Sequence, residues 1–385
     1  MKIKFISIFI VLTIFFSIDG FGQHSRLYIT AKNPSNFNRN SETIVLNWGL
    51  LKKNAPWLDS SKIVVLDSQD NKLITQSIEN EFLFQSDFNP KETKTFIIYN
   101  DSSANRTYES LADAKFILPR QDVTWENDRI AHRIYGSPLA GDVLNGVDVW
   151  VKRVRNLIMD KWYAGDSLKG KARVSYHVDH GEGADFFTVG RSLGAGGCAI
   201  WKDSLFHQTG LFISHEIIAS GPIRAKFTVW YDGDSINGKP FKEKKTYTLD
   251  AGQNMTQIDV SYSGLQDKGR ILIAAGLVKR KNTTRYSDSK QGWLSLWGDV
   301  NDDSANGSLG IGVIIPSKAF KSFGEDSSHY LIIGKANTNK QLTYYAGAGW
   351  TRSGDFNGVD EWNNYLKSFA LRLLSPLKIS ISRKK

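Results

Sequence analysis

The sequence has almost no cysteine and little proline. Its single cysteine, Cys198, excludes an intramolecular disulfide framework and a cysteine-based zinc cluster. This thiol lies in a run of small residues, 194–200, which favours a buried filler over a nucleophile. The 9 prolines stand against 33 glycines, a balance that is typical of a turn-rich β protein.

Several functional signatures are also missing. The chain has no glycine loop that ends in Lys-Ser or Lys-Thr, which argues against a common nucleotide site. The glycines of residues 190–197 are not followed by alternating helices, as a dinucleotide fingerprint would require. Lysines and arginines are scattered, so we expect no nucleic-acid partner.

Residues 1–22 have the features of a secretory signal peptide. Two lysines precede the apolar stretch 5–16, and Gly20 and Gly22 stand three and one residues before the expected cut. The apolar stretch is too short for a membrane span and no cysteine lies near the cut, so we expect no membrane anchor. The sequence therefore predicts an exported protein, periplasmic or secreted, that begins near Gln23.

The net charge of +10 belongs almost entirely to the expected mature chain. A basic exported protein is suited to an anionic partner. We therefore expect an acidic oligosaccharide as the partner, either sulfated or unsulfated.

Short strand-like runs separated by polar turns predict an all-β fold. Residues 23–115 are expected to form a small N-terminal β-sandwich. Residues 116–385 hold longer strand candidates and most of the tryptophans, and they predict a large antiparallel β-sandwich that carries the catalytic site. Apolar residues recur at helical spacing in 147–158 and in 362–369, which predicts one or two short helices packed across a sheet.

The first reactive motif spans Trp125 to Gly136. If residues 129–135 form a strand, Arg129, Arg133 and Tyr135 share one face. Two guanidiniums beside a phenol suit a carboxylate or sulfate, because the donors of arginine match planar anions. Surface ion pairs to neighbouring carboxylates are an equally good interpretation. The motif contributes five residues to the predicted site, namely Glu126, Asn127, Arg129, Arg133 and Tyr135.

The second motif, residues 176–185, is the densest reactive group. It contains Tyr176, His177, Asp179 and His180, and an Asp beside a His fixes its tautomer and raises its basicity. We expect acid–base chemistry here rather than a hydrogen-bonded strand end. A divalent cation held by the two histidines and a carboxylate is a weaker alternative, since the spacing matches no strong metal motif. No other cofactor is expected.

Two further segments supply candidate substrate contacts. Arg191 lies in the glycine-rich run 190–197, where glycines allow a close approach of the backbone to a ligand or to a neighbouring strand. Trp350 and Asp355 belong to a polar, aromatic segment, and tryptophan faces commonly support sugar rings. Core packing is the competing interpretation for any single tryptophan.

Five strings of this sequence resemble a family of exported proteins, mostly from polysaccharide-degrading bacteria, that is classed as a domain of unknown function. They are residues 125–131, 162–163, 176–185, 189–197 and 220–225. The similarity extends over nearly the whole mature chain. His132 stands where the family pattern has an aromatic residue.

Residues 220–225 and 248–252 also resemble the large β-sandwich of galactose mutarotases and related polysaccharide lyases. This resemblance implies that fold and a carbohydrate substrate. The chain is further similar to the ulvan oligosaccharide dehydratases of marine bacteria. That similarity implies removal of water from a terminal uronic acid, which leaves a 4,5-unsaturated residue.

Such an elimination removes the C5 proton and expels the C4 hydroxyl. Because the C5 proton is weakly acidic beside a charged carboxylate, a cation is needed, and Arg129, Arg133 or Arg191 are the candidates. His177 or His180 is suited to act as the base. The acid is a tyrosine of the two motifs, Tyr135 or Tyr176, or the second histidine, or one residue performs both steps.

Other functions fit the same residues. A polysaccharide lyase performs the same elimination with a different leaving group. A hydrolase would need paired carboxylates, for which Glu182 and Asp185 are weak candidates. A non-catalytic protein that binds acidic sugars would need the tryptophans but not the histidines.

Overall fold

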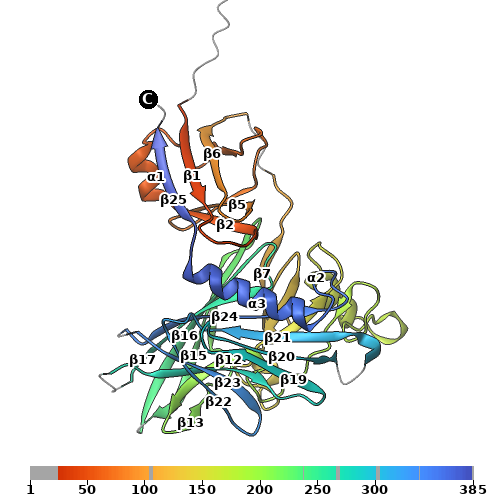
Figure 1. The fold of residues 1–385 in the computed structure, drawn as a ribbon. Helices are drawn as coiled ribbons and strands as arrows, with labels where there is room; N and C mark the ends of the chain where they lie inside the picture. The colour runs from red at the N-terminus through yellow and green to blue at the C-terminus, as the bar shows by residue number, and fades with distance from the viewer. Residues whose placement is uncertain are drawn as a thin grey trace, which may run out of the picture.

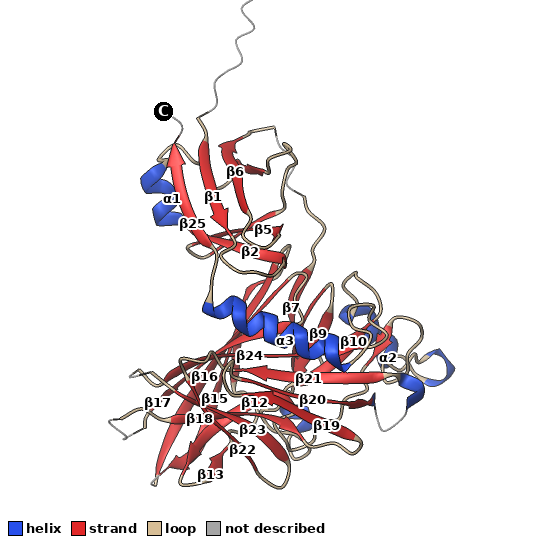
Figure 2. Cartoon of the chain, viewed as in Figure 1, coloured by secondary structure: helices blue, strands red, loops and turns tan. Residues whose placement is uncertain are grey.

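The computed structural model describes residues 25–103, 107–236, 238–265, 269–300, 304–337 and 339–383, so the predicted signal peptide lies outside the described residues. Strands dominate this part of the chain (Figure 2). All strand pairs that build its sheets are antiparallel. The predicted combination of a large antiparallel β-sandwich with a smaller N-terminal one is confirmed.

The small domain consists of a four-stranded and a three-stranded sheet, with strand orders β25-β1-β6-β3 and β2-β5-β4. Phenylalanines and aliphatic side chains from both sheets fill the space between them. The short helix α1 (Trp48–Asn54) contributes Leu51 to this core. The strands are β1 (Leu27–Lys32), β2 (Arg39–Asn47), β3 (Ile63–Leu66), β4 (Thr75–Ile78), β5 (Glu81–Phe88) and β6 (Thr93–Asn100).

The strand β25 (Lys378–Arg383) returns from the large domain to the small one and pairs with β1 (Figure 1). Its Ile381 packs against the small core. The small domain therefore extends beyond the segment 23–115 that the sequence predicts for it. Polar residues alternate with Ile379 and Ile381, and this pattern marks a strand without saying which sheet it joins.

The large domain contains three sheets. The first has the order β11-β10-β9-β8-β7, the second β13-β12-β18-β23-β22, and the third β14-β15-β16-β17-β24-β21-β20-β19. In β16, buried and exposed positions alternate along most of the strand, as one buried face requires. A continuous core joins the three sheets.

The first sheet holds β7 (Ala112–Ile117), β8 (Asp122–Asn127), β9 (Ile130–Ile134), β10 (Asp148–Lys152) and β11 (Gly183–Ala184). The second sheet holds β12 (Ala195–Lys202), β13 (Leu205–His207), β18 (Leu272–Val278), β22 (Phe320–Glu325) and β23 (His329–Lys335). The third holds β14 (Ser214–Ala219), β15 (Arg224–Ile236), β16 (Lys239–Asp250), β17 (Met255–Ser263), β19 (Thr283–Asp288), β20 (Trp293–Asp299), β21 (Ser308–Ile314) and β24 (Gln341–Trp350). Short 3-10 helices occur at Ser137–Leu139, Gly170–Ala172 and Ser304–Asn306.

Helix α3 (Val359–Leu374) lies across the outer face of the third sheet, over β20 and β21 (Figure 1). Trp362, Leu366 and Phe369 form its buried face, so the helix predicted from their spacing is present. Gly310 of β21 allows this close approach, because a Cβ there would lie 2.5 Å from the Trp362 ring.

The helix predicted over 147–158 is absent, and this prediction was wrong. Residues Asp148–Lys152 form β10, and helix α2 (Met159–Ser167) begins only afterwards. Every residue of β10 is buried. A strand that is covered on both faces loses the two-residue alternation, so its apolar residues matched a helical spacing by chance.

Candidate functional site

The two reactive motifs of the sequence meet around the side chain of Arg133. This guanidinium donates from Nε to Asp148 Oδ2 at 2.7 Å and from Nη2 to Asp185 Oδ2 at 2.8 Å. Its Nη1 lies 3.5 Å from the Tyr176 hydroxyl and 3.8 Å from Asp122 Oδ2. We call these five residues, together with Tyr135, the Arg133 cluster.

Strands β9 and β10 place Arg133 and Asp148 side by side, because the two residues are paired in the sheet. On β8 the partner of Arg133 is Thr124, and Asp122 lies two residues before it on the same face. Aromatic rings line the cluster. The Arg133 guanidinium carbon lies 4.8 Å from the ring centres of both Tyr135 and Trp150. The strand considered for 129–135 is present as the shorter β9, Ile130–Ile134, and Arg133 within it is buried.

Three carboxylates share one buried guanidinium, and two of them, Asp185 and Asp122, have a raised pKa. Burial, reinforced by the charge of Asp148, holds the pKa of Asp185 well above its usual range. Burial also raises the pKa of Asp122, although Arg133 opposes that shift. Burial and Asp148 raise the pKa of Tyr135 well above its usual value. Shifted groups of this kind are characteristic of functional sites.

His177 is the exposed member next to this cluster. Its Nδ1 lies 3.0 Å from the backbone oxygen of Asp185, and a carbonyl oxygen can only accept. The neutral ring therefore carries its proton on Nδ1 and keeps the lone pair of Nε2 free. The Asp185 carboxylate lies 3.4 Å from the same Nδ1, and the ring centre is 4.6 Å from that of Tyr176. The His177 side chain is 54% exposed, so Nε2 is accessible to a substrate.

Arg120 is a neighbour of this site that sequence reasoning missed. Its guanidinium carbon lies 5.4 Å from the centre of the Tyr176 ring, and Nη2 donates to Asp166 Oδ2 at 3.2 Å. Its side chain is 37% exposed, unlike that of Arg133. Since Arg120 lies just before β8 and outside both motifs, no signal in the sequence linked it to them.

Tyr135 and Tyr176 are buried, so neither reaches solvent as the acid that the sequence suggested. Burial also raises the pKa of Tyr176. The segment 176–182 forms turns and bends. His180 of this segment is exposed, and among the described residues no hydrogen bond, ion pair or ring contact joins it to Tyr176 or Asp185, in contrast to His177.

Asp179 stabilises this turn. Its Oδ1 accepts from the backbone N–H groups of Gly181 at 2.8 Å and Gly183 at 3.0 Å, and its Oδ2 pairs with Arg153 at 3.1 Å. Burial opposes these contacts, but together they lower the pKa of Asp179. Asp179 therefore shapes the loop that presents His177.

Glu126 and Asn127 have structural partners. Glu126 accepts from the backbone N–H groups of Ile158 and Met159 at the start of α2 and pairs with the buried Lys152 at 2.6 Å. The Asn127 amide donates to the backbone oxygens of Asp250 and Gln253. Both residues are buried, so we exclude them from direct substrate contact.

Trp350 and Arg191 are also separate from the Arg133 cluster. Trp350 is buried in the large core and donates to the backbone oxygen of Asn306 at 2.8 Å, so it offers no face to a sugar. Arg191 is exposed and donates to the backbone oxygen of Gly141 at 2.9 Å.

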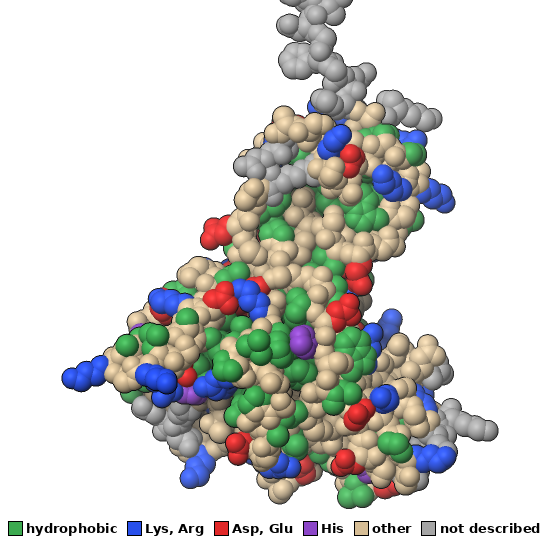
Figure 3. Space-filling model, turned by 180° about the vertical axis from the view of Figure 1, so that it is seen from behind, with side chains coloured by type: hydrophobic (Ala, Val, Ile, Leu, Met, Phe, Trp, Pro, Cys, Tyr) green, Lys and Arg blue, Asp and Glu red, His purple; other side chains and the backbone are tan. Residues whose placement is uncertain are grey.

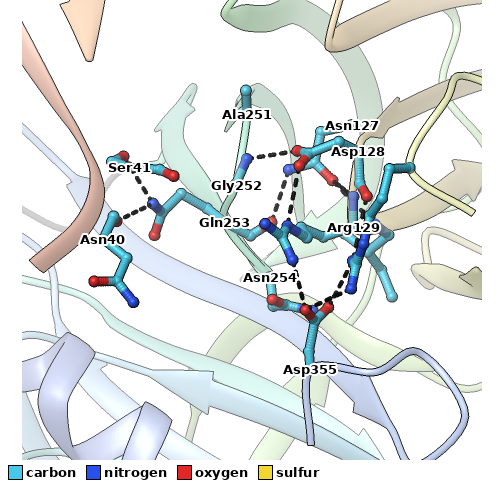
Figure 4. Close-up of polar contacts among 12 residues, drawn as sticks. Asn40, Ser41, Asn127, Asp128, Arg129, Ala251, Gly252, Gln253, Asn254 and Asp355 are labelled. Carbon is cyan, nitrogen blue, oxygen red and sulfur yellow. Dashed lines mark hydrogen bonds and ion pairs between the residues drawn. The ribbon is translucent and has the colours of Figure 1, made fainter. Parts of the chain in front are cut away.

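Arg129 and Asp355 face each other at the junction of the two domains (Figure 4). Arg129 Nη1 donates to Asp355 Oδ1 at 2.6 Å, and Arg129 Nε lies 3.0 Å from Asp128 Oδ2. Arg155 binds the same Asp355 carboxylate through both of its Nη atoms. The guanidinium of Arg129 is therefore neutralised and is not free to hold a substrate carboxylate.

On the face seen in Figure 3, lysines and arginines are scattered over both domains and alternate with acidic side chains. Within the described part of the chain, no group of three or more His, Cys, Asp and Glu side chains could hold a metal ion. None of the helices described is long and apolar enough to span a membrane.

These features define a protein of two antiparallel β-sandwiches, with a buried arginine cluster under an exposed histidine. Residues 31–379 match the family described as "Domain of unknown function (DUF4861)", and the chain belongs to this family. It is 30% identical over 376 residues to an uncharacterised protein, P7, of Formosa agariphila, a match that covers 92% of this chain and 93% of that protein.

Solved structures that are similar to this chain include a glycosidase-family protein. It is a protein in the glycosyl hydrolase family 38 from Enterococcus faecalis, with a TM-score of 0.47 and 7% sequence identity. The match covers 95% of this chain and 48% of the other, so this chain spans about half the length of that protein.

Proposed function

We propose that this protein eliminates water from a uronic acid at the end of an acidic oligosaccharide, such as a fragment of ulvan. The observation that carries the proposal is His177, an exposed base whose tautomer is set by the backbone oxygen of Asp185. A polarised, oriented histidine of this kind is what abstraction of the C5 proton needs.

The reaction proceeds at one face of the sugar. In a glucuronate chair, the C5 proton and the C4 hydroxyl lie on the same side, so one residue can serve both steps. His177 Nε2 takes the C5 proton, and the electron pair of the C–H bond forms the C4=C5 double bond as the C4–O bond breaks. The same proton passes from Nε2 to the departing oxygen, which leaves as water. The proton count is balanced and His177 returns to its starting state.

The substrate carboxylate needs a cation, because its charge opposes removal of the C5 proton. Arg129 and Arg133 are occupied by carboxylates of the protein. Arg120 is paired with Asp166, but Arg173 binds the same carboxylate, so two guanidiniums share one negative charge. Because Arg120 is also partly exposed and lies against the same Tyr176 ring as His177, we assign the carboxylate contact to it. Tyr176, Arg133 and Asp185 are positioning residues behind the site.

The decisive experiment incubates the protein with oligosaccharides that end in a uronic acid. We expect a rise in ultraviolet absorbance from the conjugated double bond and a product that is lighter by one water. Replacement of His177 by alanine should lower the rate by about 10²–10⁴-fold, whereas His180→Ala, three residues away on the same exposed loop, should leave it unchanged. An unchanged rate in His177→Ala would overturn the assignment.

The same assay tests the alternatives. A polysaccharide lyase would shorten the oligosaccharide instead of removing one water from it. Binding without any absorbance change would favour a non-catalytic sugar-binding protein. We further propose that the protein acts outside the cytoplasm, because residues 1–22 have the composition of a signal peptide.

A further inference from the structure

A polar cleft opens where the small domain, the large domain and α3 meet. Its volume is about 350 Å³, within the range of small-molecule pockets. Asn38 and Asn40 line it from the small domain, and Asn364, Tyr365 and Ser368 line it from α3. We call this space the junction cleft, and it lies beside the Arg129–Asp355 pair shown in Figure 4.

The walls of the junction cleft are held in place by contacts between the domains. The Gln253 amide donates to the backbone oxygens of Asn40 at 3.2 Å and Ser41 at 2.9 Å (Figure 4). Arg372 of α3 pairs with Glu42 of the small domain at 2.6 Å. A cleft that is already formed binds its ligand without first ordering its walls.

The charges around the cleft are compensated. Asp355 is bound by two guanidiniums, and Arg372 is paired with Glu42. Glu361 accepts hydrogen bonds from the backbone and the side chain of Asn357. The lining therefore carries no surplus cation for a carboxylate or a sulfate, in contrast to Arg120 at the proposed active site.

Hydrogen-bonding capacity remains on the neutral side chains. Among the described residues, the side-chain amides of Asn38, Asn40 and Asn364 have no protein partner. The Tyr365 hydroxyl accepts from the backbone N–H of Asn254 at 2.9 Å, so its own proton is free to be donated. Amides offer donors and acceptors together, which matches the hydroxyl groups of a sugar.

We propose that the junction cleft binds a neutral pyranose unit of a carbohydrate chain. The junction cleft and the proposed active site would both bind carbohydrate, but they share no residue. A chain bound in both places would present its acidic end to His177 and a neutral unit to the cleft.

The test measures binding of neutral hexasaccharides built from glucose, mannose, galactose, xylose or rhamnose, by titration calorimetry. We expect at least one of them to bind. Asn364→Trp fills the cleft and should weaken that binding by about tenfold or more, an easily measured change. Lys367→Trp adds the same ring to an exposed position of α3 outside the cleft, and it should bind as the wild type does.

Failure of this inference is distinct from failure of the proposed function. Absence of binding to every hexasaccharide, or unchanged binding in Asn364→Trp, would overturn the cleft proposal alone. Neutral binding that persists in His177→Ala supports a separate site, whereas loss of binding in that variant would contradict it. If neutral hexasaccharides bind but no uronic acid loses water, the proposed dehydratase activity is wrong and the cleft proposal is still supported.

Discussion

Arg129 directly precedes strand β9 and Arg133 lies near its end, yet their surroundings differ. Arg133 is buried among three carboxylates and three aromatic rings, with 7% of its side chain exposed. Arg129 is 30% exposed and belongs to an open network of two arginines and two aspartates. Arg133 therefore holds buried carboxylates together behind the proposed site, whereas Arg129 neutralises aspartates at a partly exposed surface.

The difference lies in the solvent. When one partner of a buried ion pair is lost, water cannot reach the charge that remains. At the surface, water hydrates the remaining charge in place of the lost partner. We infer that the cluster around Arg133 is sensitive to single substitutions and that the junction around Arg129 tolerates them. The following four predictions test this contrast.

Replacement of Arg133 by methionine should have the largest effect. It leaves Asp122, Asp148 and Asp185 buried without their cation, and removal of one buried partner costs about 3–5 kcal/mol. Urea unfolding followed by tryptophan fluorescence measures this loss. A free energy of unfolding within 1 kcal/mol of the wild type, on the order of a surface substitution, would contradict the contrast.

His132, between the two arginines, provides a test through pH. Burial lowers its pKa to about 4, against the weaker effect of its contact with the Asp148 backbone oxygen. Between pH 6.5 and 4 His132 binds a proton in the unfolded chain but stays neutral in the native protein. The free energy of unfolding therefore falls as the pH is lowered through this window. The loss is about 3 kcal/mol across it.

The control for this prediction is His132→Phe, since the imidazole stacks on Trp125 with ring centres 5.1 Å apart and a phenyl ring can do the same. Comparing the pH dependence of unfolding in the two proteins isolates the histidine from the neighbouring carboxylates. Parallel curves between pH 4 and 6.5 would show that His132 does not titrate as described.

Gly252 tests how rigidly the junction is built. Its φ is +73°, and a Cβ at this position would lie 2.4 Å from Ser41 Oγ. Gly252→Ala should therefore cost about 1–3 kcal/mol, whereas Gly210→Ala, where a Cβ meets nothing within 4 Å, should cost much less. Equal melting temperatures for the two variants would contradict a tightly fitted junction.

Replacement of Arg129 by methionine should have the smallest effect. Arg155 still binds Asp355, and an exposed ion pair contributes only about 0.2–1 kcal/mol. Urea unfolding of this variant is the direct counterpart of the Arg133 measurement. A loss as large as that of Arg133→Met would remove the distinction between the two regions.

More of the fold than of the candidate site could be predicted from the sequence. The amphipathic spacing of Trp362, Leu366 and Phe369 predicted α3, because only one face of that helix is buried. The same method failed for β10, which is buried on both faces and shows no alternation. The spacing of apolar residues thus identifies a helix or strand with one buried face, and it misleads where every face is buried.

At the site, sequence proximity grouped residues that the fold separates. Trp350 and Glu126 carry promising side chains, but both are buried and used for structure. Conversely, Arg120 contacts the ring of Tyr176 although the two residues are 56 positions apart and no single motif contains both. His177 was identified by its chemistry, while the contact that fixes its tautomer depends on the turn formed by 176–185.

The return of β25 to the small domain has a consequence for biosynthesis. Strand β1 lies between β6 and β25, and β25 is made only after the whole large domain. During translation, β1 therefore has one unpaired edge until the end of the chain emerges, and unpaired edges invite pairing with other chains. The small sandwich cannot be completed before β25 is made, so a chain that ends before Lys378 would hold every strand of the large sandwich but lack one partner of β1.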